Sequence, residues 1–192
     1  MSESLGNRDL ILASALRLFA ERGYEAVGVA EICESTQVTK PTLYHYFGSK
    51  RGLLDAIVAE RGGPLLERAR KVAPDPADVP YGLERLLFAL AASAKEDPDF
   101  ARLRLCLAFA PPKSEGGEAA AAFNQSIYEL AEAYFAAAAR HHGNMKGRSR
   151  AYAVSFLGIA DSYIGLFLAG HIALSETVLR GAVRQFMYGI FS

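Results

Sequence analysis

The sequence predicts an all-α protein, and three observations support this prediction. Apolar residues recur with the spacing of a helix face along the whole chain, and no sustained alternation of period two indicates a strand. The 192 residues are 51% hydrophobic and 22% charged and include only eight prolines, which is typical of a folded protein with a well-buried core. Clusters of glycine, proline and aspartate divide the chain into about nine helical segments.

Three short helices are expected in the N-terminal part. Asn7 is placed to cap the first helix, and Gly23 follows as the left-handed residue that often ends a helix. The second helix covers residues 29–35 and is only about two turns long. Thr39 is expected to cap the third helix, which runs to Phe47. Two short helices joined by a tight connection have the organisation of a helix-turn-helix.

Longer helices are expected beyond this region. A fourth helix opens at Ser49, and the Gly-Gly-Pro sequence at 62–64 either interrupts it or kinks it. The sequence PDPADVP at 74–80 is a clear connection. Five further helices are expected at about residues 80–95, 97–109, 118–142, 148–171 and 175–190.

Positive and negative charges balance over the whole chain. Twenty-one lysines and arginines oppose twenty-one aspartates and glutamates, so no global field holds the chain on nucleic acid or on an anionic membrane. Any such contact must therefore be local. The opening residues, MSESLGNRDL, contain no apolar signal-peptide core, and we expect a cytoplasmic protein.

Two cysteines stand in apolar sequence without a CxxC motif or a Cys/His cluster. This pattern is typical of a reducing compartment and excludes a zinc finger or a disulfide scaffold. Cys33 is expected to be a buried, unreactive thiol, and Cys106 is expected in the core or in a pocket wall. The sequence shows no Ser/His/Asp arrangement, glycine-rich phosphate loop or HExxH motif, so we expect no enzyme, no metal and no cofactor.

One segment has to be tested as a membrane span. Between Arg150 and Glu176 the only formal charge is Asp161, and more than about 20 largely apolar residues is the length of a span. A carboxylate near the middle of a span costs about 2.5–3.5 kcal/mol. We therefore expect a buried helix, no membrane partner, and a structural hydrogen bond for Asp161 in preference to a ligand contact.

The third helix offers the chemistry of a DNA-reading surface. Leu43 and Phe47 share the face that packs inward. The outward and flanking positions carry a proline, a hydroxyl, an imidazole and two phenols: Pro41, Thr42, Tyr44, His45 and Tyr46. Between Ser35 and Leu54 the only formal charges are three cations, which give a local charge of +3: Lys40, Lys50 and Arg51. Small polar groups suit base edges and cations suit phosphates, although any solvated helix face has a similar composition.

Three runs in this region carry a family resemblance: GYE at 23–25, VAEI at 29–32 and VTKPTLYHYFGSKRGLL at 38–54. Over about residues 8–60 they closely resemble the DNA-binding domain of the TetR family of transcriptional regulators. The resemblance implies a one-component repressor that dimerises and binds a small effector. It implies three regions: a DNA-binding domain at 1–52, a connecting helix at about 50–72, and an effector-binding and dimerisation domain at 65–192.

The resemblance also implies roles for single residues. Four positions match phosphate contacts of the family: Thr39, Tyr44, Tyr46 and Lys50. Four others fall where the family meets base edges: Lys40, Pro41, Thr42 and His45. This chain departs from the family pattern at Gly28, where a threonine usually opens the second helix, and at Gln37, where glycine is usual. Gln37 therefore sits in a tight turn in which a positive φ would strain its backbone.

The last two helices carry more apolar surface than one core needs, and a four-helix seam between two copies would bury the surplus. We therefore expect a homodimer that reads the two halves of a near-palindromic operator in double-stranded DNA. The residues expected at the dimer interface are Phe156, Ile164, Phe167, Leu179, Val183, Phe186, Met187 and Ile190.

Aromatic and aliphatic residues with few charges occupy the helices between residues 80 and 171, as a ligand cavity requires. A largely apolar effector is expected among Phe88, Leu103, Leu107, Phe123, Tyr128 and Tyr163, although a core stripe has the same spacing. One alternative function stays open at this point: a helical-bundle enzyme or small-molecule carrier that uses Asp161, Tyr163 and His171.

Overall fold

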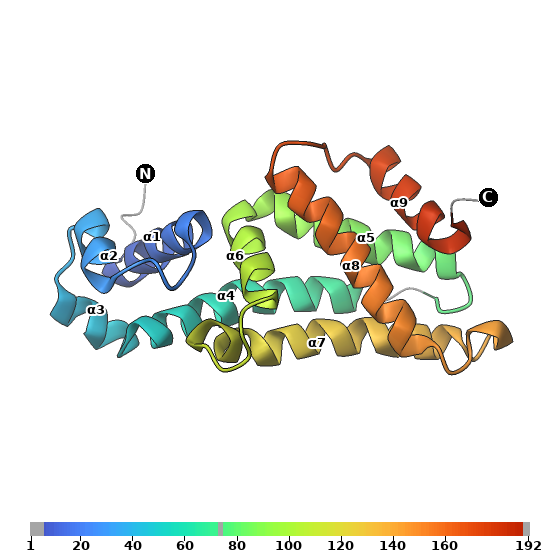
Figure 1. The fold of residues 1–192 in the computed structure, drawn as a ribbon, viewed down its shortest axis with the longest axis horizontal. Helices are drawn as coiled ribbons and strands as arrows, with labels where there is room; N and C mark the ends of the chain where they lie inside the picture. Colours follow the sequence, from blue (N-terminus) through green and yellow to red (C-terminus); the bar gives the residue numbers. More distant parts are fainter. Residues whose placement is uncertain (1–5, 73–74, 190–192) are drawn as a thin grey trace. The chain divides into compact units, whose positions relative to one another are not determined.

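The computed structural model describes residues 6–72 and 75–189, and its ribbon is shown in Figure 1. Within these residues the regular secondary structure is helical throughout, which confirms the all-α prediction. The described part of the chain forms nine α-helices and one 3-10 helix, η1. Their bounds are α1 Asn7–Arg22, α2 Val29–Thr36, α3 Lys40–Phe47, α4 Lys50–Lys71, α5 Val79–Glu96, α6 Pro98–Ala108, α7 Glu115–Ala138, η1 Gly143–Met145, α8 Ser149–Leu168 and α9 Glu176–Tyr188.

The chain forms two compact units. The first unit takes residues 1–63 and 99–123, and the second takes residues 64–98 and 124–192. In the first unit, α1, α2, α3 and the first part of α4 are therefore joined by α6 and by the first turns of α7. The N-terminal helices thus share a compact body with segments that lie far away in the sequence.

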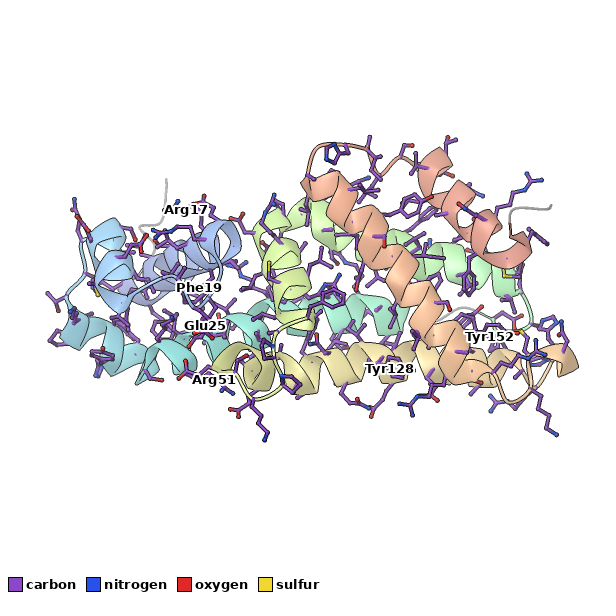
Figure 2. The ribbon with its side chains drawn as sticks, viewed as in Figure 1. Arg17, Phe19, Glu25, Arg51, Tyr128 and Tyr152 are labelled. Carbon is purple, nitrogen blue, oxygen red and sulfur yellow. The ribbon has the colours of Figure 1, made fainter. Side chains whose placement is uncertain are left out.

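A small apolar core holds the N-terminal helices together. Ile11 and Phe19 of α1 are fully buried, as are Ile32 of α2 and Leu43 of α3. Figure 2 labels Phe19 among these helices, and its ring meets the buried ring of Tyr24 edge-on, with centroids 5.1 Å apart. Burying one such side chain contributes about 1.5–3 kcal/mol. The complete burial of Leu43 confirms the inward face expected for the third helix.

Local hydrogen bonds determine which residues cap the N-termini of α1 and α3. Thr39 caps α3 as expected, since its hydroxyl accepts a bond from the backbone N–H of Thr42 at 3.4 Å. The expectation that Asn7 caps α1 is wrong. Gly6 is the capping residue, because its backbone is extended and its carbonyl accepts the N–H of Leu10 at 3.1 Å, so Asn7 is already helical.

Gln37 ends α2 in the left-handed region, with φ 54° and ψ 28°, as its place in the tight turn predicted. Its backbone N–H donates to the carbonyl of Glu34 at 3.4 Å, so the conformation serves to cap the helix. For a residue with a Cβ this conformation costs about 1–2 kcal/mol.

Replacing Gln37 with glycine is expected to raise the free energy of unfolding by about 0.5–1 kcal/mol, because glycine adopts the left-handed region without strain but loses more backbone entropy on folding. Urea denaturation followed by circular dichroism measures this change. Gln37→Ala keeps the Cβ and is the control. An equal gain in both variants would show that backbone strain is not the cause.

Helix α4 continues through Gly62, Gly63 and Pro64, so the Gly-Gly-Pro sequence does not interrupt it. A Cβ on Gly62 would lie 2.7 Å from Cδ2 of Phe123, whereas a Cβ on Gly63 would meet nothing within 4 Å. The Phe123 ring in turn meets Phe100 edge-on, with centroids 6.0 Å apart. The missing side chain of Gly62 therefore allows the close approach of the Phe123 ring.

The two neighbouring glycines are expected to respond to alanine with opposite signs. Gly62→Ala should lower the free energy of unfolding by about 1–3 kcal/mol, because the Phe123 ring has to move. Gly63→Ala should raise it by up to about 1 kcal/mol, because alanine favours the helix and space is open. Urea unfolding of the two variants side by side measures both changes, and equal stabilities would contradict the close approach.

In the second unit an aromatic cluster joins α7, α8 and α9. The ring centroid of Phe135 lies 6.2 Å from that of Phe156 and 6.1 Å from that of Phe186. Next to the cluster, Tyr134 donates its hydroxyl to the carbonyl of Val79 at 3.2 Å, and burial raises the pKa of this phenol to about 12. The hydroxyl therefore remains a donor at any physiological pH.

The two cysteines differ in their surroundings. Cys33 is buried in α2, which confirms the prediction, but Cys106 is exposed, so the expectation that it lies in the core or in a pocket wall is wrong. On α6 the buried residues include Leu103 and Leu107, while Arg102 and Cys106 are exposed. The apolar neighbours in the sequence thus point inward and leave the thiol in solvent.

Candidate DNA-binding surface and ligand cavity

The eight residues expected to contact DNA lie on α3 and beside its two ends. Leu43 is fully buried and anchors the helix, while Thr42 and Lys50 are half-buried. The other six are exposed: Thr39, Lys40, Pro41, Tyr44, His45 and Tyr46. The structure therefore gathers all eight on one short segment whose polar face is accessible.

Two phenols and two hydroxyls give this surface its chemistry. Tyr44 and Tyr46 expose 46% and 42% of their surface, which leaves both rings and hydroxyls open to a partner. The hydroxyl oxygens of Thr39 and Thr42 lie 2.9 Å apart, and the rings of His45 and Tyr46 meet edge-on with centroids 5.4 Å apart. These contacts order the polar groups before any ligand binds.

The two cations that follow α3 are held differently. The ammonium nitrogen of Lys50 lies 4.1 Å from the centre of the Tyr24 ring. Arg51, labelled in Figure 2, donates to Asp55 at 2.9 Å and to Glu118 at 3.1 Å. The hydrogen bond to Asp55 raises the pKa of Arg51 further above its ordinary value. In the described parts of the chain Lys50 has no carboxylate partner, so Lys50 is the cation left for a phosphate.

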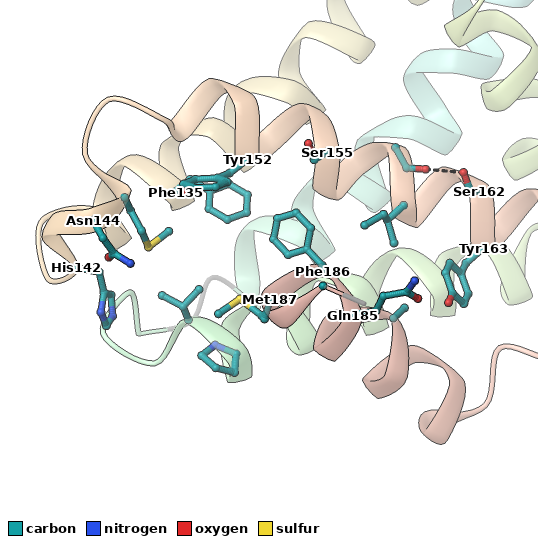
Figure 3. Close-up of a pocket in the computed structure, with 17 residues that line it drawn as sticks. Phe135, His142, Asn144, Tyr152, Ser155, Ser162, Tyr163, Gln185, Phe186 and Met187 are labelled. Carbon is teal, nitrogen blue, oxygen red and sulfur yellow. Dashed lines mark hydrogen bonds between the residues drawn. The ribbon is translucent and has the colours of Figure 1, made fainter. Parts of the chain in front are cut away.

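A cavity of about 1010 Å³ opens between α8 and α9 in the second unit, and Figure 3 shows it. Its apolar walls include Phe135, Met145, Tyr152, Ile159, Phe186 and Met187. Its polar lining groups are His142, Asn144, Ser155, Ser162, Tyr163 and Gln185. Ligand pockets usually enclose about 300–1,000 Å³ and combine apolar walls with a few polar groups, so this cavity has the size and lining of a ligand site.

Polar groups lie at both ends of this cavity, and Ser155 lies between them (Figure 3). His142 and Asn144 lie at one end in Figure 3, and Tyr163 and Gln185 lie at the other. The Nε2 atom of His142 is 3.0 Å from the carbonyl oxygen of Ala77. A second cavity of about 480 Å³ in the same unit is lined by residues of α4, α5 and α7 and includes the charged groups of Arg70 and Glu129.

The six expected effector residues are divided between the two units. Tyr163 lines the large cavity. Phe88 and Tyr128 are half-buried in the second unit. The remaining three are buried in the first unit: Leu103, Leu107 and Phe123. The large cavity instead uses Phe135 and Phe186, which sequence reasoning missed as pocket residues because a core position and a cavity wall have the same helical spacing.

The outward face of α8 is apolar. Four of the residues expected at a dimer interface are buried within the chain: Phe156, Ile164, Leu179 and Val183. Three others, Phe167, Phe186 and Met187, are half-buried, and Ile190 lies outside the described residues. On the outer side of the same helix, Val154 and Leu166 expose 55% and 44% of their surface. Ser149–Leu168 is long and apolar enough to cross a membrane, and only 22% of its most apolar stretch is buried.

The residues of the alternative function do not form a site. Asp161 and Tyr163 stand two positions apart on α8, and residues at that spacing do not face each other. His171 is exposed in the connection that follows the helix. The described residues contain no group of three or more His, Cys, Asp or Glu side chains that could hold a metal ion.

Comparison with known proteins identifies the N-terminal helices. Residues 11–57 match the model of the family described as bacterial regulatory proteins, tetR family. The HTH-type transcriptional regulator UidR of Escherichia coli is 31% identical over 86 residues, which are 45% of this chain and 44% of UidR. The HTH-type transcriptional repressor ComR of Escherichia coli is 42% identical over 52 residues, or 27% of this chain and 25% of ComR. The chain is thus matched over less than half the length of these relatives.

The whole fold also has a solved counterpart. The crystal structure of the transcriptional regulator FadR from Bacillus subtilis in complex with stearoyl-CoA superposes with a TM-score of 0.75, at 17% identity, over 95% of this chain and 98% of FadR. The relatives that match are transcriptional regulators and not enzymes, in agreement with the expectation from the sequence. Residues 11–57 thus resemble the DNA-binding domain of the tetR family of bacterial regulatory proteins, and nearly the whole chain shares the fold of FadR.

Proposed function

We propose that this regulator acts in the cytoplasm as a homodimer on a near-palindromic operator and represses transcription until a small, largely apolar effector releases it. The observation that carries the proposal is α3, which Leu43 anchors and whose outer face is polar, exposed and free of acidic residues. The match to the repressor ComR in this region supports repression as the direction of control. The proposed regions are a DNA-binding domain at 1–52, a connecting helix at about 50–72 and an effector-binding and dimerisation domain at 65–192.

The eight residues of this surface have proposed roles. Thr39, Tyr44, Tyr46 and Lys50 contact phosphates and fix the register of the protein on the duplex, while Lys40, Pro41, Thr42 and His45 meet base edges in the major groove. A neutral protein relies on such local contacts, because its net charge contributes no attraction to DNA.

A second copy of the chain is proposed to cover the outward face of α8. The exposed Val154 and Leu166 supply apolar contact for the partner helix. A two-fold axis through this face would place two copies of α3 on two half-sites of one operator.

The effector is proposed to bind in the cavity between α8 and α9, whose apolar walls and polar ends suit an apolar chain with a polar end group. FadR of the same fold was solved with stearoyl-CoA, a ligand of this chemistry. Release requires the effector to favour the state that does not bind the operator, by about 1.4 kcal/mol for each tenfold loss of DNA affinity.

A selection from a pool of random-sequence duplexes tests the proposal. Repeated retention by the protein, followed by sequencing, is expected to enrich a near-palindromic site, and binding to that site should weaken steeply with salt. Stearoyl-CoA and free stearate are then titrated into the complex as two separate probes of release. A protein that retains no sequence above the starting pool, even at low salt, does not have the proposed function.

A further inference from the structure

The first turn of α7 contacts the N-terminal helices within the first unit. The hydroxyl of Tyr24 donates a hydrogen bond to the carboxylate of Glu115. One turn further along α7, Glu118 accepts a hydrogen bond from Arg51 at 3.1 Å. All four residues belong to the same compact unit. Two carboxylates of α7 therefore hold two residues that flank the proposed DNA-binding surface.

Tyr24 links Glu115 to Lys50. Only 4% of Tyr24 is exposed, and its ring packs edge-on against Phe19 with centroids 5.1 Å apart. Burial, with the hydrogen bond to Glu115, raises the pKa of Tyr24 far above its usual range, so the phenol stays neutral and keeps donating. The Lys50 ammonium lies over this fixed ring, 4.1 Å from its centre. A cation over an aromatic ring is attracted to it, so the orientation of the ring sets the place of the ammonium.

We propose that Glu115 is a positioning residue for DNA binding, which orients the Tyr24 ring and thereby places the Lys50 ammonium for contact with a phosphate. Glu118 supports Glu115 in this role by holding Arg51, which follows Lys50 at the start of α4. The proposal rests on the proposed function, since it assigns to Lys50 a contact with the DNA backbone. It concerns residues 115–118, which lie far outside the segment that resembles a DNA-binding domain.

Removing Glu115 distinguishes a positioning role from a purely electrostatic effect, because the two change DNA affinity in opposite directions. An acidic residue near DNA repels phosphates, so its removal alone would strengthen binding to every sequence. The positioning role has the opposite sign, because without its acceptor the Tyr24 ring no longer fixes Lys50. Glu115→Ala is therefore expected to weaken binding about two- to fivefold, the range of one exposed cation–ring interaction.

The experiment compares variants of the full chain on the selected operator and on a scrambled duplex of the same composition, over a series of salt concentrations. Lys50→Gln should reduce the slope of log K against log salt by about 0.9 for each phosphate that the protein no longer neutralises, and Glu115→Ala should shift the slope in the same direction. Glu115→Gln keeps a hydrogen-bond acceptor and should restore most of the affinity. Glu25→Ala removes the same charge from an exposed residue next to Tyr24 and is the matched control.

The double variant decides between a positioning role and a merely structural one. In the Lys50→Gln background, Glu115→Ala should cause no further loss of affinity, because both changes act on the same interaction with a phosphate. Additive losses, or stronger binding by Glu115→Ala alone, would overturn the proposal. Failure of the proposed function looks different, since the unaltered protein would then show no salt-dependent binding to either duplex.

Discussion

Replacing Val154 and Leu166 of α8 together with arginine is expected to turn the proposed homodimer into a monomer and to weaken binding to the proposed operator by a factor of about 10² to 10⁴. Both side chains are exposed in the isolated chain, so the substitutions leave its own core intact. In a two-fold dimer they would bring four additional positive charges into one apolar seam, which cannot solvate them. A monomer contacts only one half-site. It therefore lacks the high effective concentration that a dimer, once bound to one half-site, has for the other.

Light scattering gives the mass of the variant, and titration of the operator gives its affinity. Ala136→Arg, at an exposed position of α7 in the same unit, adds the same kind of charge on another helix and is the control. A double variant that keeps the mass and the operator affinity of the parent would show that α8 is not part of the dimer interface. If the unaltered chain is a monomer that sediments with lipid vesicles, its apolar face serves a membrane instead.

Alanine substitutions on α3 and at the start of α4 are expected to divide into two classes. Thr42→Ala and His45→Ala should change which sequence is preferred, each with a loss of about 1–3 kcal/mol of discrimination, because a base edge that loses its partner is no longer distinguished. Tyr44→Ala and Lys50→Ala should weaken binding to all sequences alike, because phosphates carry no sequence information. The first class tests base contacts, and the second tests backbone contacts.

Competition with operators altered at one base pair at a time separates these classes. Arg17→Ala on α1 removes an exposed cation that pairs with Glu21 at 3.2 Å, and it should leave both affinity and preference unchanged. If all four variants bound like the parent, another element would read the DNA.

Local features of this chain were predictable from its sequence. The cap at Thr39, the left-handed Gln37 and the buried face of Leu43 depend on residues within one or two helical turns, and the spacing of residue types reports such geometry directly. The outward groups of α3 followed from the same spacing. The failure at Asn7 was also local, since either of two adjacent residues can begin a helix and only the backbone conformation decides.

Long-range packing was not predictable in this way. The bond between Tyr24 and Glu115 joins residues 91 positions apart, and no local period reports such a pairing. The same limit applies to the large cavity, because the apolar stripe that carries Phe135 would look identical in a solid core. Cys106 was misplaced because its neighbours in sequence are apolar, whereas its neighbours on the helix face are exposed.

The composition of the first unit has a consequence for synthesis and for protein engineering. Residues 1–63 leave the ribosome before residues 99–123 exist, so the N-terminal helices acquire the Phe123 ring against Gly62 and the Glu115 acceptor for Tyr24 only late in translation. A chimera cut after residue 63 and fused to a foreign sensor domain would carry the DNA-reading helix without these partners. Grafting residues 99–123 as well, as a second insertion, transfers the complete folding unit.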